Sequence, residues 1–312
     1  MEIKGIGIDI ADARVQGDPQ RLETELDCLR ACGFEAVELT TSGFFVVRNG
    51  KLDQRQADSL LQVLGKFPFR YTLHAPDCLN LAVSPYPELE RQIFSSCLEF
   101  ARLAGAEVLV YHCGQEFLRL SAGREREKAV GLERRALREL AEEAEAKNIM
   151  IAVENADPVD GEAELLAARA GEGNELRALH PSLYLELVGQ TVLAARSQNV
   201  GLTLDLGHLF LASRLTGMEF LDSIADQAAL VRHLHLHDNF GRLPASAHNE
   251  MERAVYGEGD CHLPPGLGAI PIREALGLLG SFNGFIILEI KPQYRSCCRE
   301  ALSRMRSLLE TL

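Results

Sequence analysis

The stretch Gly201-Leu202-Thr203-Leu204-Asp205 decides the fold, because it is one of six short apolar runs that end on a possible metal ligand. Such a run predicts a strand that is buried on both faces. The other five occupy residues 70–74, 108–112, 149–154, 233–237 and 284–289. In a parallel barrel, the carboxyl ends of the strands form the mouth at which enzymes place their chemistry. The six runs therefore predict a barrel with polar side chains around its mouth.

Eight predicted strands alternate with helical segments along the whole chain. Two more strands are expected before the six runs, at residues 3–8 and 36–40. Residues 87–103 and 124–147 carry apolar side chains at helical spacing, and the mixed charges of the second segment indicate a solvated helix face. Eightfold alternation of strand and helix implies right-handed crossovers and a parallel sheet that closes on itself. We therefore predict an α/β fold, a single-domain (β/α)8 TIM barrel over residues 1–312.

Two connections are longer than the rest, and both follow strands. Residues 156–181, after the fifth predicted strand, are acidic and contain glycine, and residues 240–270 follow the seventh. A loop that follows a barrel strand lies over the mouth, where lids and substrate loops are found. We predict that both segments are lid-like insertions.

The composition is that of an ordinary globular protein, with 46% hydrophobic and 25% charged residues. The formal net charge of −13 argues against a globally basic nucleic-acid binder, so nucleic acid is not an expected partner. We expect neither a secretion signal nor a membrane span. The eight cysteines form no C-x-x-C pair, which favours reduced thiols and a cytoplasmic location. Acidic surface helices neither require nor forbid a homo-oligomer.

Carboxylates and imidazoles gather at the predicted mouth. Each of them alone could be a hydrogen-bonded core residue or an ion-pair partner, but side chains at the same level of a barrel converge on its axis. Mixed ligands of this kind suit Mn, Mg, Zn or Fe rather than a metal selected by thiolates. A divalent ion would also offset the repulsion among buried carboxylates. The residues concerned come from four strands and are Glu154, Asp205, His208, His235 and Glu289.

Three histidines alternate along the seventh predicted strand, at positions 233, 235 and 237. Side chains two residues apart lie on one face of a strand. We expect His233 to be a packed, hydrogen-bonded residue deeper in the barrel. His237 is expected nearer the mouth, where it could support a ligand or contact the substrate. His180 and His248 are expected to be exposed.

The motifs that carry these residues resemble those of the xylose-isomerase-like barrels. This superfamily includes sugar isomerases, sugar epimerases and AP endonucleases of the endonuclease-IV type. The resemblance extends from about residue 3 to residue 291. The matching stretches are His74-Ala75-Pro76, Asn80-Leu81-Ala82, Tyr111-His112-Cys113-Gly114, Val153-Glu154-Asn155, Leu204-Asp205-Leu206-Gly207-His208, His235-Leu236-His237-Asp238, Asp260-Cys261-His262, Gly266-Leu267-Gly268 and Leu288-Glu289.

The resemblance implies two alternative sets of metal ligands. Sugar isomerases and epimerases of this type hold one divalent ion, which would be bound here by Glu154, Asp205, His235 and Glu289. Endonuclease-IV-like enzymes hold three zinc ions with a larger set. Both sets are complete in this sequence, so the number of ions, from one to three, stays open. The larger set would add His74, His112, His208, Asp260 and His262.

The first function that the resemblance implies is isomerisation or epimerisation of a sugar or sugar phosphate by proton transfer through an enediolate. A divalent ion would bind the carbonyl and the neighbouring hydroxyl group, and Glu154 and Glu289 would remove and return the proton. This hypothesis places the protein in carbohydrate metabolism. The expected substrate contacts are His208, His237, Lys291 and Arg242, the last two for a phosphate or carboxylate group.

The second function is hydrolysis of a phosphodiester, in abasic DNA or in a small molecule, by several zinc ions. The complete nine-residue set favours it. The loops oppose it, because an AP endonuclease grips and bends DNA with basic side chains and large wedges. Asp77 stands where the DNA enzymes carry an aromatic wedge. We therefore favour the sugar enzyme, and a third hypothesis is a metal-binding barrel without catalysis.

Overall fold

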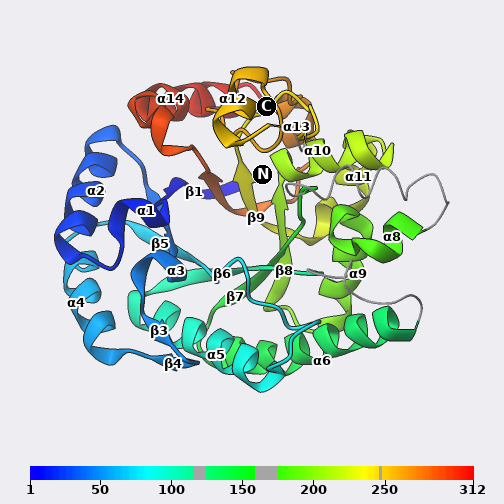
Figure 1. Ribbon diagram of the computed structural model, residues 1–312. Helices are drawn as coiled ribbons and strands as arrows, with labels where there is room; N and C mark the ends of the chain where they lie inside the picture. Colours follow the sequence, from blue (N-terminus) through cyan, green and yellow to red (C-terminus); the bar gives the residue numbers. More distant parts are fainter. Residues whose placement is uncertain (115–123, 159–174, 246–247) are drawn as a thin grey trace.

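A computed structural model describes residues 1–114, 124–158, 175–245 and 248–312. Eight parallel strands close into a barrel in the order β1-β10-β9-β8-β7-β6-β5-β2, with helices around it (Figure 1). This closed barrel confirms the predicted fold. The barrel strands are β1 (Glu2–Asp9), β2 (Ala36–Thr40), β5 (Arg70–His74), β6 (Ala106–His112), β7 (Met150–Glu154), β8 (Val200–Asp205), β9 (Val231–Leu236) and β10 (Asn283–Leu288).

Local sequence signals set the ends of the surrounding helices. The carboxylate of Asp205 accepts a hydrogen bond from the backbone N–H of His208 at 2.6 Å, so α10 (Leu206–Thr216) begins there. It ends at Gly217, whose φ of 73° favours glycine. Within the described ranges, no helix has both the length and the apolar character needed to cross a membrane. The other α-helices of the described residues are α1 (Asp12–Val15), α2 (Pro19–Cys32), α3 (Thr41–Phe44), α4 (Gln54–Leu64), α5 (Pro87–Ala104), α6 (Arg124–Ala146), α8 (Glu175–Leu179), α9 (Leu185–Ala195), α11 (Phe220–Gln227), α12 (Glu250–Tyr256), α13 (Ile272–Gly277) and α14 (Cys298–Leu309).

The barrel interior changes from apolar to polar towards the mouth. Every second residue of a strand faces the barrel axis, so each strand contributes one inward row. The apolar part of these rows forms one packed cluster of Ala36, Val108, Val110, Ala152, Phe285 and Ile287. Between this cluster and the mouth, the rows contribute the polar residues Glu38, Thr72, Thr203 and His233, all fully or almost fully buried. The side chains at the mouth therefore rest on a buried polar layer above an apolar floor.

One antiparallel pair of strands departs from the predicted pattern. β3 (Val47–Arg48) and β4 (Lys51–Leu52) form a hairpin in the loop after β2. Asn49 and Gly50 connect them, both with positive φ, as a tight hairpin turn requires. Two residues per strand are too few for an alternation pattern to be recognised in a sequence.

The two predicted lid segments are described to different extents. Of residues 156–181, positions 159–174 lie outside the described residues. Residues 240–270 contain α12, whose first turn is closed by a capping box between Asn249 and Glu252. The buried carboxylate of Asp238 accepts hydrogen bonds from the backbone N–H groups of Gly266 and Ile270, at 2.9 and 3.1 Å. These bonds hold the returning end of the segment to the end of β9.

Candidate metal centre

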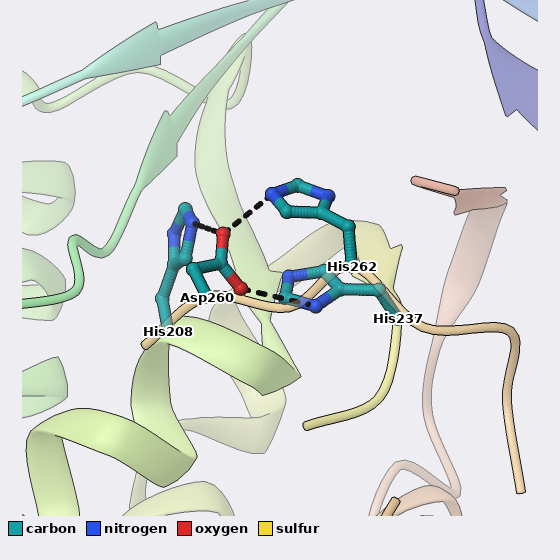
Figure 2. A group of neighbouring side chains, drawn as sticks. All are labelled: His208, His237, Asp260 and His262. Carbon is teal, nitrogen blue, oxygen red and sulfur yellow. Dashed lines mark ion pairs between the residues drawn. The ribbon is translucent and has the colours of Figure 1, made fainter. Parts of the chain in front are cut away.

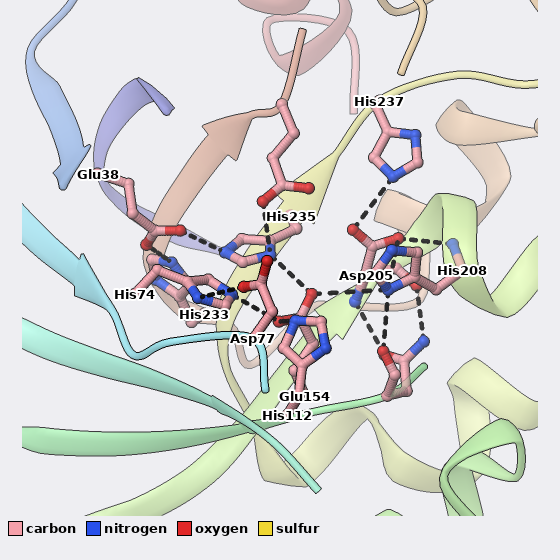
Figure 3. A network of polar contacts seen from close by, with 12 residues as sticks. Glu38, His74, Asp77, His112, Glu154, Asp205, His208, His233, His235 and His237 are labelled. Atoms are coloured by element: carbon pink, nitrogen blue, oxygen red, sulfur yellow. Dashed lines mark hydrogen bonds and ion pairs between the residues drawn. The ribbon is translucent and has the colours of Figure 1, made fainter. Parts of the chain in front are cut away.

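Glu154 lies at the centre of the polar cluster in the barrel mouth. It ends β7, and its side chain is almost completely buried. Its Oε1 lies 2.8 Å from Nδ1 of His235, while its Oε2 lies 2.8 Å from Nε2 of His112 and 3.3 Å from Nε2 of His74 (Figure 3). One carboxylate therefore meets histidines from three other strands.

Glu289, which follows β10, joins this group through His235. Its Oε1 lies 3.2 Å from Nδ1 of His235, the nitrogen that also faces Glu154. Asp205 lies beside Glu154 in a neighbouring group that includes His208. The structure thus brings the predicted four-residue ligand set together: the carboxylates of Glu154 and Glu289 both face Nδ1 of His235, and Asp205 lies beside Glu154.

Glu38 is a residue of this centre that the strand-end pattern missed. It lies inside β2 and is 1% exposed, and its Oε2 accepts hydrogen bonds from Thr72 and His233 at 2.8 and 2.9 Å. Its Oε1 lies 2.8 Å from Nε2 of His235. The alternation of charged Glu38 with apolar Val37 and Leu39 could have indicated an inward carboxylate. These contacts hold Nε2 of His235 and turn its Nδ1 towards Glu154, and the hydrogen bond of His233 confirms the prediction made for that residue.

The remaining predicted site residues occupy different places. His208, Asp260 and His262 lie together next to the central cluster (Figure 2). Nζ of Lys291 donates a hydrogen bond to the backbone carbonyl of Asp260 at 3.0 Å, which places it beside this second group. Arg242 is exposed and donates to the carbonyl of Tyr256, so the structure does not bring its guanidinium group to the cluster.

Two histidines outside the cluster differ from the expectation of exposure. His180 is 7% exposed, and its Nδ1 lies 3.0 Å from Oγ of Ser182, so the prediction is wrong for this residue. His248 is partly buried, because its ring stacks on Tyr256 and its Nδ1 lies 2.9 Å from the carboxylate of Glu258. Both rings find partners in the loops that follow strands β7 and β9.

The carboxyl groups of Glu154 and Glu289 have pKa values that are shifted in opposite directions. Burial acts to raise the pKa of Glu154, but His235 and His112 hold it well below its usual range. Burial raises the pKa of Glu289 to about 8, against the opposing effect of His235 and His262. A pair of carboxyl groups with such different pKa values can act as a proton acceptor and a proton donor at the same pH.

The donor atoms fit a divalent cation. His74, Glu154 and His235 each offer one ligand atom within 4.8 Å of the others, and so do Glu154, Asp205 and His208. Oδ2 of Asp205 is buried and lies 3.2 Å from Nε2 of His237, but neither atom makes a hydrogen bond within the described part of the chain. Leaving a buried polar atom unpaired costs about 1–3 kcal/mol, which a bound cation would offset. Imidazole nitrogens and carboxylate oxygens admit Mn, Mg, Zn and Fe.

A cavity of about 290 Å³ opens onto this centre. His74, His112, Glu154 and Glu289 form part of its wall, and acidic and hydroxyl side chains form much of the rest. Among the described residues, no lysine or arginine lines it. Two of the acidic residues were also missed: Asp9, the last residue of β1, and Asp12, the first residue of α1. The first predicted strand runs directly into Asp9. The additional polar lining residues are Asp9, Asp12, Glu38, Thr40, Ser42, Asp77, His208 and His262.

The stability of the metal-free protein is expected to fall as the pH rises from roughly 5 to 9. Burial raises the pKa of Glu289 from 4.5 to about 8. Burial acts to lower the pKa of His74, but Glu154 and Asp77 raise it from 6.5 to about 10. Both groups bind protons more tightly in the folded chain, so their contribution to stability is fully present below the ordinary pKa values and lost towards the raised ones.

Thermal unfolding of chelator-treated and metal-loaded protein across this pH range checks the expectation. A divalent ion competes with protons for the same ligands, so the Tm of the loaded protein should rise relative to that of the metal-free protein as the pH increases. A Tm of the metal-free protein that increases from pH 5 to 9 would contradict the expectation.

Comparison with known proteins relates the chain to one family of TIM barrels. The profile of the family described as xylose isomerase-like TIM barrel matches residues 26–308. A search among curated proteins found no significant match.

Solved structures share the whole architecture at low sequence identity. A D-tagatose 3-epimerase-like protein is 20% identical, with a TM-score of 0.69 and coverage of 98% of this chain and 97% of its own. The IolI protein with a bound zinc atom is 17% identical, with a TM-score of 0.64 and coverage of 98% and 96%. D-psicose 3-epimerase from Clostridium cellulolyticum H10 is 14% identical, with a TM-score of 0.65 and coverage of 98% and 99%. Since the family profile spans most of the sequence, the chain belongs to the xylose isomerase-like TIM barrel family.

Proposed function

We propose that the protein is a divalent-metal-dependent isomerase or epimerase that acts on a sugar by proton transfer. One observation carries the proposal: Glu154 and Glu289, from β7 and β10, both approach Nδ1 of His235, at 2.8 and 3.2 Å. Two carboxylates beside one metal position supply the two proton-transferring groups that inversion of a carbon centre requires. The epimerases of similar structure share the fold alone, so the proposal rests on this site.

The lining of the cavity supports a neutral, polyhydroxylated substrate. A volume of about 290 Å³ suits a small molecule, and Asp9, Thr40 and Ser42 offer groups that can hydrogen-bond to hydroxyls. An anionic substrate would meet the carboxylates of Asp9, Asp12 and Asp77 without a lysine or arginine from the described lining to offset them. We therefore place an unphosphorylated sugar ahead of a sugar phosphate.

The proposed roles follow from the positions of the side chains. A divalent ion held by Glu154, Asp205, His235 and Glu289 would polarise a substrate carbonyl and lower the pKa of the C–H group beside it. Glu154 and Glu289 come from separate strands, so one can accept a proton on one face of the substrate carbon while the other returns a proton to the opposite face. Glu38 holds the ring of His235 in the orientation that this arrangement needs.

Exchange of substrate hydrogen with solvent tests the proposal. Chelator-treated protein is reloaded separately with Mn, Mg, Zn or Fe and incubated with a panel of unphosphorylated aldoses and ketoses in D2O. We expect deuterium to enter at the carbon beside the carbonyl, as followed by NMR, with at least one metal. The metal-free protein is the control, and the absence of exchange with every metal and sugar would contradict the proposal.

A second candidate function is phosphodiester hydrolysis by several zinc ions, and the surroundings of Glu154 favour it. Its Oε1 faces His235 while its Oε2 faces His74 and His112, an arrangement in which one carboxylate could bridge two cations. Cleavage of abasic-site DNA or of a small phosphodiester, without solvent exchange into sugars, would support this function. Bound metal without either activity would favour a metal-binding barrel.

We also propose a binding partner and a cellular location for the protein. A small sugar is the proposed partner, and nucleic acid becomes one only under the second function. A cytoplasmic location with reduced cysteines remains our proposal, since the eight cysteines are all free in the structure.

A further inference from the structure

We propose that the substrate is a disaccharide or a similar glycoside, whose second ring occupies a separate cavity beside the metal centre. This inference rests on the proposed sugar chemistry and deepens it, because it names the class of sugar that the site accepts. The cavity has a volume of about 380 Å³, which is within the range of ligand pockets. Its described lining comes from residues 240–263, from the segment that follows β10 and from Asp157.

The second cavity adjoins the cavity of the metal centre at His262. This side chain lines both cavities and is 25% exposed, and its ring stacks on that of His237 with centroids 4.1 Å apart. Asp260, in the second cavity, lies 3.5 Å from Nε2 of His208, which lines the first. A sugar bound at the metal centre therefore has the second cavity as its neighbour, and a substituent on it can extend past His262.

Two aromatic rings line the second cavity. Phe240 is 42% exposed, and Tyr294, in the short helix η4 (Pro292–Cys297), is partly buried and packs against the core. The carbon-bound hydrogens on one face of a pyranose ring form an apolar surface. Packing this face on an aromatic ring removes apolar area of both from water. The two rings are therefore suitable surfaces for a second sugar ring.

Gly257 holds the ring of Phe240 in place. A Cβ atom at position 257 would lie 2.5 Å from Cδ2 of Phe240, far inside contact distance, and the φ of Gly257 is 65°. The backbone of the loop therefore packs directly against one side of the ring, which only glycine permits. A ring that is already fixed loses little conformational freedom when a ligand packs on its exposed part.

Polar side chains of the cavity offer partners for sugar hydroxyl groups. Gln293 is exposed, and its amide both donates and accepts hydrogen bonds. Nζ of Lys291 is held by the carbonyl of Asp260 at 3.0 Å and carries further N–H groups, while the carboxylate of Asp157 accepts hydrogen bonds. Donors and acceptors thus lie in the same cavity as the two aromatic rings, as binding of a polyhydroxylated ring requires.

The charges of the lining favour a neutral ring over a phosphate group. Besides His262, the ionisable side chains of the described lining, cysteine and tyrosine aside, are the cations of Arg253 and Lys291 and the carboxylates of Asp157, Glu258 and Asp260. The carboxylates offset the two cations, so a phosphate would meet no excess of positive charge. Lys291, expected from the sequence to contact a phosphate or carboxylate, is in this arrangement a donor to a hydroxyl group.

Calorimetric titration of the full-length, metal-loaded protein tests the inference. The probes are the reducing disaccharides cellobiose, maltose, lactose and lactulose, each compared with glucose, galactose and fructose. We expect at least one disaccharide to bind about tenfold or more tightly than any of the single-ring sugars, because its second ring packs on Phe240 and Tyr294. F240A should abolish this preference and leave the Kd values of the single-ring sugars unchanged. Q293A, which changes an exposed side chain, should reduce the preference without affecting the fold.

A control variant and the exchange assay separate the second cavity from the metal centre. M251A removes an exposed side chain of α12 that lies outside the described lining, so it should retain the preference for disaccharides. The absence of such a preference in the wild type, or an unchanged preference in both F240A and Q293A, would overturn the inference. Deuterium exchange into single-ring sugars without a disaccharide preference would leave the proposed function standing and refute the role of the cavity. A preference that F240A abolishes, without exchange into any sugar, would support the cavity and contradict the proton-transfer function.

Discussion

Replacement of Glu289 by glutamine is expected to lower kcat for the sugar substrate by about a thousandfold, within the range by which a positioned acid or base accelerates a reaction. The amide cannot accept a proton and is a weaker metal ligand than the carboxylate. Glu289 is placed to do both, since its Oε1 lies 3.2 Å from the His235 nitrogen that faces Glu154. E154Q removes the partner carboxylate and should have an effect of similar size.

Steady-state kinetics with saturating metal, together with thermal unfolding, measures this effect. E289Q is expected to keep the Tm of the metal-free wild type or exceed it at alkaline pH, because burial disfavours the charged carboxylate. Glu300 offers a matched control, since it is exposed on α14 and pairs with Arg304 outside the mouth. E300Q should leave kcat unchanged. Activity of E289Q close to that of the wild type would show that Glu289 neither transfers the proton nor holds the metal.

Replacement of Glu38 by alanine is expected to lower the free energy of unfolding by about 3–5 kcal/mol, the usual cost of breaking a buried charged pair by removing one partner. Glu38 lies 2.8 Å from Nε2 of His235 and accepts a hydrogen bond from His233, and both rings are fully buried. Without this carboxylate, His235 loses the contact that orients its ring. Metal affinity is therefore expected to fall by about 10- to 100-fold.

Chemical unfolding and metal titration separate the two effects of the Glu38 substitution. T72V is the matched control, since the hydroxyl of Thr72 donates to the same carboxylate at 2.8 Å. Its removal should cost about 1 kcal/mol and leave the metal affinity close to that of the wild type. Equal loss of metal affinity in E38A and T72V would mean that the orientation of His235 does not depend on the Glu38 charge. Comparison of E38Q with E38A then shows how much of the loss of stability and metal affinity comes from the missing charge of Glu38 and how much from the missing side-chain volume.

The strand-end pattern was a good guide to the centre because it uses the simplest property of a parallel barrel. Glu154, Asp205 and Glu289 each follow or end a run of buried residues, and the carboxyl ends of all strands open on one side. The pattern missed Glu38 because this residue lies within β2 and not at its end. It missed Asp9, which ends β1, because the six runs that define the pattern all lie later in the chain. The hairpin of β3 and β4 escaped prediction because each strand has two residues.

Side chains on loops were the least predictable from the sequence. Arg242 was expected at the substrate, but the loop directs it to the carbonyl of Tyr256. His180 was expected at the surface, but it packs beside Ser182 in the segment that returns to α9. No periodic pattern governs such residues, since their positions depend on contacts between distant segments.

The sequence by itself determined the closed barrel, its strand positions and the carboxylates and histidines at its mouth. These features follow from local hydrophobic patterns and from the fixed direction of side chains along a strand. Only the tertiary structure decided which nitrogen of His235 faces Glu154, how Glu38 orients that ring, and that His237 meets Asp260 across the returning loop. These relations depend on distances of a few ångströms between residues far apart in the chain, which packing of the whole barrel sets.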